Sequence, residues 1–408
     1  MNSVDSQMTV HGVVAAGFEP VRTTFQQLVD AGDLGEGGAA YAAYHRGALV
    51  VDLWAGAAGE VAWGRDTRNT WMSTTKAMTA LCIQILVDRG RLDVDDAVAV
   101  HWPAFARNGK DAITIRHVLT HAGGVPGSRD LTALVDPLTG AGIGDGKAIL
   151  EAIEDLTPIW EPGTRNGYHA LTYSWILGEV LRRIDGRTLG TFFRDEVALP
   201  LGCDDAWIGT PDEEQNDIAP LLHLMTPSNT PEPAVAYMQT LLAQARDPDT
   251  AAGRSLMGRG DSSVLDHLPE VFNSPAGLRA ELGGSNLVAT ARSIARIFAA
   301  IVEPDGIDGV RLASAESFEQ FAELQSSAVD EVMLLPIGRA LGYWRNLALA
   351  GRPQSCGPNE ETILHSGMGG QLGFADPVAR IAGAYTRSHH TAFPIAPVLL
   401  NNAVHACA

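Results

Sequence analysis

The sequence predicts an α+β fold. Segments with strand patterns lie toward both ends of the 408-residue chain, and segments with helical patterns fill the middle. Strands and helices do not alternate as they would in a protein built from βαβ units, and no internal repeat is visible. This order favours one sheet built from both ends of the chain, with a helical insertion between them.

The first patterned segments predict two strands followed by a helix. Residues 37–56, GGAAYAAYHRGALVVDLWAG, have the pattern of two strands around a His-Arg-Gly turn. Residues 73–89 carry apolar side chains at helical spacing, so we expect a helix there. Ser73 is placed to cap the start of this helix, and Gly90 is placed to end it.

The middle of the chain predicts further helices separated by loops. Residues 113–127 suit a short helix that ends in a glycine- and proline-containing loop, and residues 128–158 suit loops with one short helix. Residues 171–184 are helical again, followed by a turn and another helix in RIDGRTLGTFFRDEVALPLG. Residues 211–275 are polar and contain prolines, so we expect an irregular surface excursion there.

The last third of the chain returns to strands. An amphipathic helix is expected over residues 286–302, and a closing helix over residues 394–408. Between them, residues 341–350, 361–366 and 380–385 have strand patterns.

The composition is that of a globular protein and excludes several kinds of partner. Hydrophobic residues make up 46% of the chain, which is enough for a large core. A formal charge of −19 disfavours binding to nucleic acid or to anionic membranes. The N-terminal segment lacks the pattern of a secretory signal, and no segment is long and apolar enough to span a bilayer. We therefore expect a cytoplasmic protein.

Four scattered cysteines give no sign of a disulfide framework or of a cysteine metal site. Cys82 lies in an apolar helical run, so we expect it in the core. His117 and His121 have the spacing of a metal pair, but HVLTH lacks the glutamate of the HExxH motif, so a structural role is favoured. No cofactor and no metal are expected.

The strongest chemical signal is Ser73-Thr74-Thr75-Lys76, within WMSTTKAMTA. The chain has three lysines and twenty-six arginines, and only Lys76 follows a serine by three residues. On a helix these two side chains share a face. A serine is a poor nucleophile until a base takes its proton, which a lysine of lowered pKa can do and an arginine cannot. The alternative interpretation is a capping serine beside a solvated lysine.

Two further segments could complete a site. NGYHALTYSW places Tyr168 in a loop ahead of an apolar helix, where a phenol could relay protons; alternatively, Tyr168 and Tyr173 are core aromatics. LHSGMGGQLGFADP predicts a strand that runs into a turn dense in glycines, which allow close approach of the backbone to a ligand. It fails as a dinucleotide loop because Leu372 stands where the last glycine is required. GGSNL, residues 283–287, lacks the second glycine of a nucleophile elbow.

Taken together and in this order, the three motifs resemble the serine β-lactamase and penicillin-binding superfamily, which pairs S-x-x-K with a tyrosine or serine motif and a K-T-G strand motif. The chain is more similar still to the class C β-lactamase-like esterases called family VIII carboxylesterases. The resemblance covers nearly the whole chain. It includes VVDLWAG, the long segment from STTKAMTALCIQILVDRG to LTHAGGVPG, WEPGTRNGYHALTYSWILGEVLRRIDGRTLG and HSGMGGQLGFADP.

The resemblance implies a single catalytic domain, residues 1–408, with an antiparallel sheet flanked by helices beside an all-helical subdomain. The sheet subdomain would comprise about residues 1–70 and 285–408, and the helical subdomain about residues 71–284. The site would lie between the two subdomains.

Site residues follow from the same resemblance. Ser73 matches the acylated nucleophile, Lys76 the base that activates it, and Tyr168 the tyrosine that relays protons to and from the leaving group. The backbone N–H groups of Ser73 and Met368 match the oxyanion hole.

The strand motif and the tyrosine motif also depart from the β-lactamase pattern. His365-Ser366-Gly367 stands where K-T-G is found, with His365 in place of the lysine that helps bind a substrate carboxylate. Ala170 stands where β-lactamases keep the asparagine of Y-x-N. Both departures weaken a β-lactamase or DD-peptidase interpretation and favour neutral esters or amides.

The leading hypothesis is a serine hydrolase that cleaves small carboxylic esters, or amides, through an acyl-Ser73 intermediate. The alternative is an acyltransferase of natural-product biosynthesis, in which an amine or alcohol acceptor replaces water at the same site. A β-lactamase or DD-peptidase is less favoured, and a non-catalytic binding protein on the same scaffold least of all.

Overall fold

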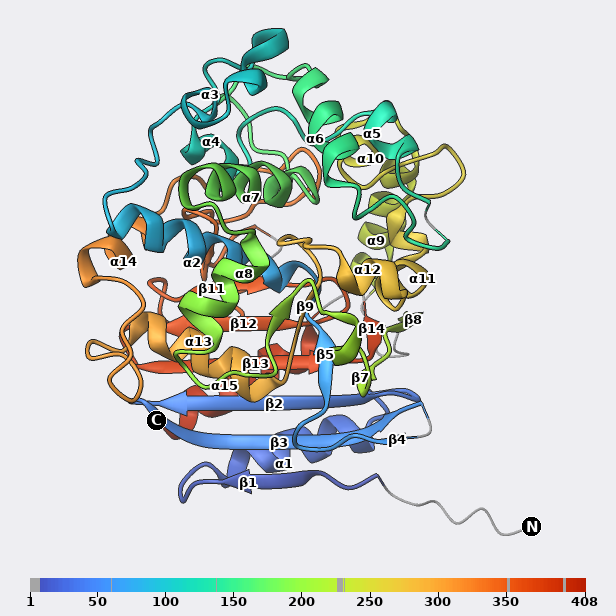
Figure 1. The fold of residues 1–408 in the computed structure, drawn as a ribbon. Helices are drawn as coiled ribbons and strands as arrows, with labels where there is room; N and C mark the ends of the chain where they lie inside the picture. Colours follow the sequence, from blue (N-terminus) through green and yellow to red (C-terminus); the bar gives the residue numbers. More distant parts are fainter. Residues whose placement is uncertain are drawn as a thin grey trace.

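A central antiparallel sheet organises the chain in the computed structural model, which describes residues 8–408 apart from 60, 137, 226–229, 231, 351–352 and 392–393. The sheet lies at one end of the molecule and most helices lie at the other (Figure 1). Its strands, in spatial order, are β1 (His11–Val14), β3 (Ala48–Ala58), β2 (Gly38–His45), β13 (Ile381–Arg387), β12 (Leu372–Asp376), β11 (Ile363–Ser366) and β10 (Trp344–Arg345), with β4 (Val61–Ala62) paired to β3.

The two ends of the chain meet at the centre of this sheet. β2 pairs with β13 in antiparallel register, with Tyr41 opposite Tyr385. The N-terminal strands and the C-terminal strands thus form one continuous surface, as the order of patterned segments predicts. The α+β class and the antiparallel sheet are therefore confirmed.

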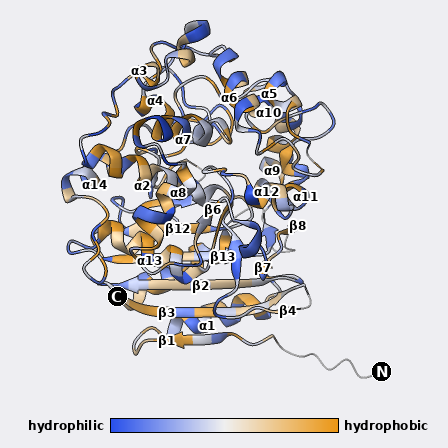
Figure 2. Cartoon of the chain, viewed as in Figure 1, coloured by the Kyte–Doolittle hydropathy of each residue, from blue (hydrophilic) through white to orange (hydrophobic). Residues whose placement is uncertain are grey.

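Helices cover both faces of the sheet. On one face lie α1 (Glu19–Asp30) and α15 (Ile395–Cys407), where Tyr41 Oη donates to Asn401 Oδ1 at 3.0 Å. On the other lies α13 (Ala291–Val302), whose Phe298 packs against β12. In Figure 2 the hydrophobic colour gathers on α13 and on parts of β3. The core is therefore formed between the sheet and these helices.

Many of the remaining helices lie beyond the long helix α2 (Thr75–Asp88) as seen from the sheet, and the others lie beside it (Figure 1). They are α3 (Val98–His101), α4 (Ile115–Leu119), α5 (Arg129–Ala133), α6 (Gly146–Asp155), α7 (Thr172–Asp185), α8 (Leu189–Phe193), α9 (Glu232–Arg246), α10 (Ala251–Ser255), α11 (Leu268–Phe272) and α12 (Pro275–Arg279), with α14 (Ala315–Ala322) beside α2.

Short elements join these parts. Two small sheets contain β6 (Trp207–Ile208), β9 (Leu287–Ala289), β5 (Arg68–Thr70) and β7 (Ile218–Ala219), and β14 (His389–Thr391) with β8 (Leu222–Met225). Short 3₁₀ helices occur at η1 (Met72–Thr74), η2 (Pro103–Gly109), η4 (Asp212–Glu214) and η5 (Val264–Asp266), and a π-helical turn occurs at η3 (Arg194–Ala198).

Several expectations need correction. The segment 211–275 is not irregular, because it contains the 15-residue helix α9 and three shorter helices. The segment 286–302 begins as strand β9 before α13, since Leu287–Ala289 pairs with two neighbouring strands. Ser73 does not cap α2; it lies inside η1, and the N-cap residue is Thr74.

Other differences concern short strands and helices. The glycine-dense segment after Ser366 contains a full strand, β12, and only Trp344–Arg345 of residues 341–350 forms a strand. Residues 128–158 hold two helices, α5 and α6, in place of one. Strand β14 includes His390, which is buried. Cys82 is fully buried, as predicted.

Among the described residues, no helix has both the length and the apolar character needed to cross a membrane.

The contact between α13 and β12 tests how tightly the sheet is packed. A Cβ added at Gly373 would lie 2.2 Å from Phe298 Cε2, inside a closed core. We expect Gly373→Ala to lower the free energy of unfolding by about 1–3 kcal/mol, because overpacking forces the ring or the helix to shift. Urea denaturation of the full chain measures this change.

Gly146→Ala is the matched control. Gly146 opens α6, and a Cβ added there would meet no atom within 4 Å. This variant should leave stability unchanged or raise it by about 0.4–1 kcal/mol. Equal losses for the two variants would contradict tight packing at Gly373.

Candidate active site

A strained turn presents Ser73 at the start of α2. Met72, the residue before it, has φ +45°, a left-handed conformation that is uncommon for a residue with a side chain. The buried Trp71 anchors the turn on β9, because its N–H donates to Leu287 O at 2.8 Å and its Nε1 donates to Ala289 O at 3.0 Å. Ser73 itself remains partly exposed.

The threonines of the S-x-x-K motif hold this turn in place. Thr75 Oγ1 donates to Met72 O at 2.5 Å and accepts from Leu287 N–H at 3.0 Å. Thr74 Oγ1 donates to His365 O at 3.3 Å, which links the turn to β11. The serine turn is therefore connected to both the small sheet and the central sheet.

Lys76 is fully buried one turn further along. Its Nζ donates to Ala170 O at 2.7 Å and to Gly284 O at 2.8 Å, and it lies 4.7 Å from the centroid of the Tyr168 ring. Burial, and after it the positive charge of Arg339, hold the pKa of Lys76 well below its usual range. The environment therefore favours the neutral amine.

Close approach of the 283–287 segment to Lys76 requires glycine. A Cβ on Gly284 would lie 3.0 Å from Lys76 Nζ and 2.9 Å from Ala170 O. A Cβ on Gly283 would lie 2.4 Å from Thr79 Oγ1, whose hydroxyl donates to the Gly283 carbonyl at 2.6 Å. GGSNL is not a nucleophile elbow, as expected, yet its glycines allow a carbonyl to bind the lysine.

Tyr168 lies over Lys76 and reaches Ser73. The ring is almost fully buried, and Tyr168 and Ser73 line the same cavity. Burial raises the pKa of Tyr168 above its usual value, while the nearby Ser73 side chain and the charge of Arg339 act in the opposite direction. The structure thus brings Ser73, Lys76 and Tyr168 together.

Buried histidines pack next to the Tyr168 ring. The ring centroid of His121 lies 4.7 Å from that of Tyr168, and His121 Nδ1 accepts the backbone N–H of His169 at 3.0 Å. His117 Nδ1 accepts the N–H of Thr114 in the cap of α4. These bonds give both histidines structural partners. Among the described residues, no group of three or more His, Cys, Asp or Glu side chains is arranged to hold a metal ion.

The turn between β11 and β12 forms the wall of the site next to Ser73. Gly367 N–H donates to Gln371 O at 2.7 Å, and a Cβ on Gly367 would lie 2.6 Å from Trp71 O, so the turn is pressed against the serine turn. Met368 follows, and no hydrogen bond of the described residues uses its N–H. The two N–H groups predicted as an oxyanion hole therefore belong to adjacent turns.

His365 is placed differently from the expectation of a substrate-binding residue. The side chain is 1% exposed, and its ring centroid lies 4.9 Å from the Trp344 ring. His365 Nδ1 lies 2.9 Å from the Ser366 carbonyl, and burial and the charge of Lys76 hold the pKa of His365 well below its usual range. Because alternate strand residues face opposite sides, Leu364 and Ser366 line the cavity and His365 does not. Its burial argues against direct contact with a substrate.

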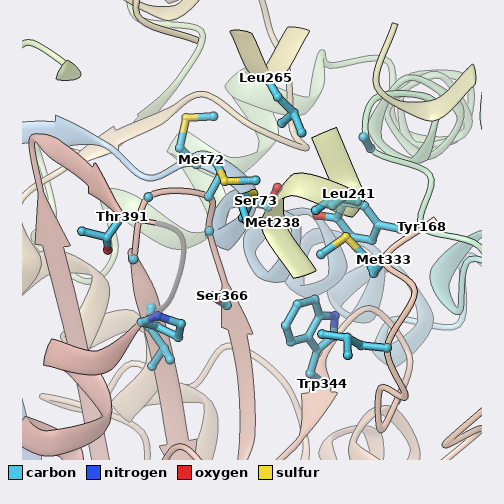
Figure 3. Close-up of a pocket in the computed structure, with 18 of the residues that line it drawn as sticks. Met72, Ser73, Tyr168, Met238, Leu241, Leu265, Met333, Trp344, Ser366 and Thr391 are labelled. Carbon is cyan, nitrogen blue, oxygen red and sulfur yellow. The ribbon is translucent and has the colours of Figure 1, made fainter. Parts of the chain in front are cut away.

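An apolar cavity of about 410 Å³ opens beside Ser73 and Tyr168. Figure 3 shows Tyr168 and Trp344 on one side of it and Thr391 on the other. Its other walls come from α9, α11, α15 and the turn after β11. None of the described residues that line it has a charged side chain. Such a cavity suits a neutral group with a large apolar surface.

Helix α9 and the loop before β10 close one wall of this cavity. Tyr237 Oη donates to Met333 O at 2.8 Å, which joins the helix to the loop. Met238 and Leu241 of α9, together with Leu335 of the loop, line the cavity. Neither segment carries a sequence motif.

Three other side chains near Tyr168 were not predicted from the sequence. Ser255 Oγ donates to Tyr168 O at 2.5 Å and accepts from Ala170 N–H at 2.9 Å, which fixes the loop that carries the tyrosine. Asp330 accepts the Tyr168 N–H at 3.0 Å and pairs with the buried Arg339. The adjacent glycines of the GGS segment can be noticed in the sequence. Ser255, Asp330 and Arg339 belong to no motif, because they come from distant parts of the chain and meet Tyr168 only in the folded structure.

Comparisons with known proteins agree with this arrangement. The chain is 32% identical to the esterase/beta-lactamase LipL of Mycobacterium tuberculosis over 362 residues, which is 85% of this chain and 76% of that protein. A crystal structure of a family VIII carboxylesterase matches with 29% identity and a TM-score of 0.82, covering 98% of this chain and all of that chain (100%).

A penicillin-binding protein homologue from Caulobacter crescentus gives the same TM-score of 0.82 with 32% identity, again over 98% of this chain and 100% of that chain. EstA from Arthrobacter nitroguajacolicus follows with 26% identity, a TM-score of 0.79 and 97% of each chain covered. The sequence model of the family described as Beta-lactamase matches residues 21–397. The chain therefore belongs to the β-lactamase family, with esterases among its relatives.

Proposed function

We propose that this protein is a serine esterase that cleaves neutral carboxylic esters through an acyl-Ser73 intermediate. The observation that carries the proposal is the state of Lys76. A neutral lysine amine has two N–H bonds and one lone pair. The carbonyls of Ala170 and Gly284 take both N–H bonds, so the lone pair is left to accept a proton.

Acylation then balances as follows. Ser73 Oγ attacks the ester carbonyl carbon while its proton passes to Lys76 Nζ, and the carbonyl oxygen takes the negative charge. The N–H groups of Ser73 and Met368 are placed to stabilise this oxyanion. Tyr168, with a raised pKa, stays a neutral phenol near neutral pH. It therefore donates its proton to the leaving alkoxide and regains one from Lys76.

Deacylation repeats these roles with water. As water attacks the acyl carbon, Tyr168 and Lys76 together take one of its protons. They return a proton to Ser73 Oγ when the bond between Ser73 and the acyl group breaks and the acid leaves. If an alcohol or amine enters in place of water, the same steps produce a transferred acyl group.

The apolar cavity supports a neutral substrate. No Lys or Arg side chain is among the described residues that line it, and His365, in the place of the strand lysine, is buried. A substrate carboxylate would therefore lose hydration without gaining a cationic partner, which is unfavourable. LipL, a relative that shares 32% identity, is described as an esterase/beta-lactamase, which also supports ester cleavage here.

Covalent labelling tests the nucleophile. A fluorophosphonate should add one phosphonyl group to the wild-type chain, because Ser73 is partly exposed and next to its base. Ser73→Ala should give no adduct, and intact-mass spectrometry measures both. Thr75→Ser keeps the hydroxyl that holds the turn and serves as the control variant. An equal adduct on Ser73→Ala would contradict the proposal.

Replacing Lys76 by arginine tests the base. Arginine keeps a long basic side chain but stays protonated and offers no lone pair, so Lys76→Arg should slow Ser73 labelling at neutral pH by at least about 100-fold. In the wild type, labelling should fall as the pH drops below the lowered pKa of Lys76, because the lone pair is then protonated. Near-normal labelling in a folded Lys76→Arg variant would remove Lys76 from this role.

A pair of esters tests the charge preference of the cavity. Matched aryl esters should be compared, one with an apolar acyl group and one with a terminal carboxylate of similar length. We expect kcat/KM to be at least about 10-fold higher for the apolar ester, because an unpaired charge loses its hydration in an apolar cavity. Comparable values, or a preference for the acid, would contradict a neutral substrate. Added alcohols that yield new esters in place of the acid would assign acyl transfer.

A further inference from the structure

We propose that Arg339, held by Asp330 beneath Tyr168, is a positioning residue that keeps Lys76 ready to accept the proton of Ser73. This inference rests on the proposed function of Ser73 and Lys76. It assigns a task to an ion pair that belongs to none of the three motifs.

The pair is completely enclosed. The side chains of Arg339 and Asp330 are 2% and 0% exposed, and the guanidinium donates to Asp330 Oδ2. A buried ion pair of this kind contributes little to stability in general, because desolvation offsets the attraction between the charges. Its burial beside the proposed catalytic residues therefore calls for another explanation.

Asp330 connects the pair to the backbone of Tyr168. Its Oδ1 accepts three N–H groups, those of Tyr168 at 3.0 Å, Val332 at 2.9 Å and Met333 at 2.8 Å. The first bond fixes the main chain that carries the phenol. The other two fix the loop whose Met333 lines the cavity.

Arg339 is buried next to the Tyr168 ring. Its guanidinium carbon is 5.8 Å from the ring centroid, and Lys76 Nζ is 4.7 Å from the same centroid. The backbone of Arg339 is fixed by Ser326, with which it exchanges N–H···O bonds of 2.7 Å and 3.3 Å. A permanent cation is therefore held at a set position close to the proposed base.

The two members of the pair act differently on the two catalytic groups. For Lys76, Arg339 lowers the pKa of the amine, and Asp330 acts there as the counter-charge of that cation. For Tyr168 the pair acts in both directions, since Arg339 lowers the pKa of the phenol and Asp330 raises it. Removing both charges should therefore change Lys76 more than Tyr168.

Other groups around Lys76 do not replace this cation. The titratable side chains near it are Tyr168 and His169 in the loop before α7, Tyr173 on α7, His121 after α4, and His365 on β11. Burial lowers the pKa of each of these histidines and raises the pKa of each of these tyrosines, so all are neutral near pH 7. Arg339 is left as the permanent positive charge acting on Lys76.

The pH dependence of Ser73 labelling tests the proposal. The double variant Arg339→Met/Asp330→Asn removes both charges, keeps an oxygen to accept the Tyr168 N–H, and leaves no buried charge unpaired. With the cation gone, Lys76 holds its proton to higher pH. The acid limb, the low-pH part of the pH profile where the fluorophosphonate labelling rate falls, should move up by roughly one pH unit. At a given pH on that limb, labelling should therefore be about 10-fold slower than in the wild type. The rate on the alkaline plateau should be retained.

Two single variants keep the proposal testable if the double variant does not fold. Arg339→Lys keeps the charge without the fork of N–H donors and should leave the acid limb near that of the wild type. Asp330→Asn leaves the cation without its counter-charge and should move the limb to lower pH, opposite to the double variant. Asp52→Asn/Arg292→Met removes an ion pair distant from Lys76 and serves as the control, with an unchanged limb.

The outcomes separate this inference from the proposed function. Suppose that the wild type is labelled at Ser73, and that the acid limb of the double variant lies at the same pH as that of the wild type while only its labelling rate on the alkaline plateau falls. The ion pair is then structural and the inference is wrong. An equal upward shift in Arg339→Lys would also overturn it, because the charge is retained there. If the wild type is not labelled at Ser73 at all, the proposed function itself fails.

Discussion

Lys76 is buried with no carboxylate partner in the part of the chain that the structure describes, and the site depends on this constraint. An ammonium ion in such a place loses its hydration, so the neutral amine is favoured and becomes able to accept a proton. Two backbone carbonyls, of Ala170 and Gly284, hold the amine in position without supplying a charge. A carboxylate in their place would stabilise the ammonium and remove the base.

Much of the surrounding structure follows from that constraint. Glycines at 283 and 284 are needed because any side chain there would collide with Lys76 or its neighbours. The strained conformation of Met72 and the anchoring of Trp71 set the serine one turn before the lysine. The central sheet supplies the opposing turn at Met368. The proposed nucleophile, the proposed base and the proposed oxyanion donors thus come from rigid elements whose positions the core fixes.

Much of the cavity beside the site is formed by segments that do not bind Lys76. Helices α9, α11 and α15 form several of its walls, whereas the loop before β10 carries both Met333, which lines the cavity, and the Asp330–Arg339 pair. In the β-lactamase family, the same catalytic group can therefore serve different substrates when these walls change. Here the described walls are apolar and uncharged, which favours a neutral ester.

The sequence by itself determined the fold class and the family, and it indicated the chemistry proposed here. The fold class and the chemistry both depend on local patterns. The motifs are S-x-x-K, the segment around Tyr168 and the glycine-dense turn, and the strands and helices show in the spacing of apolar residues. Local patterns of this kind can be recognised in the sequence alone. Tertiary structure alone decided that His365 is buried, that α9 is a cavity wall, and that Asp330 and Arg339 lie beneath Tyr168. The physical reason is that burial and electrostatic environment depend on which distant segments pack together, and no spacing within one segment records that.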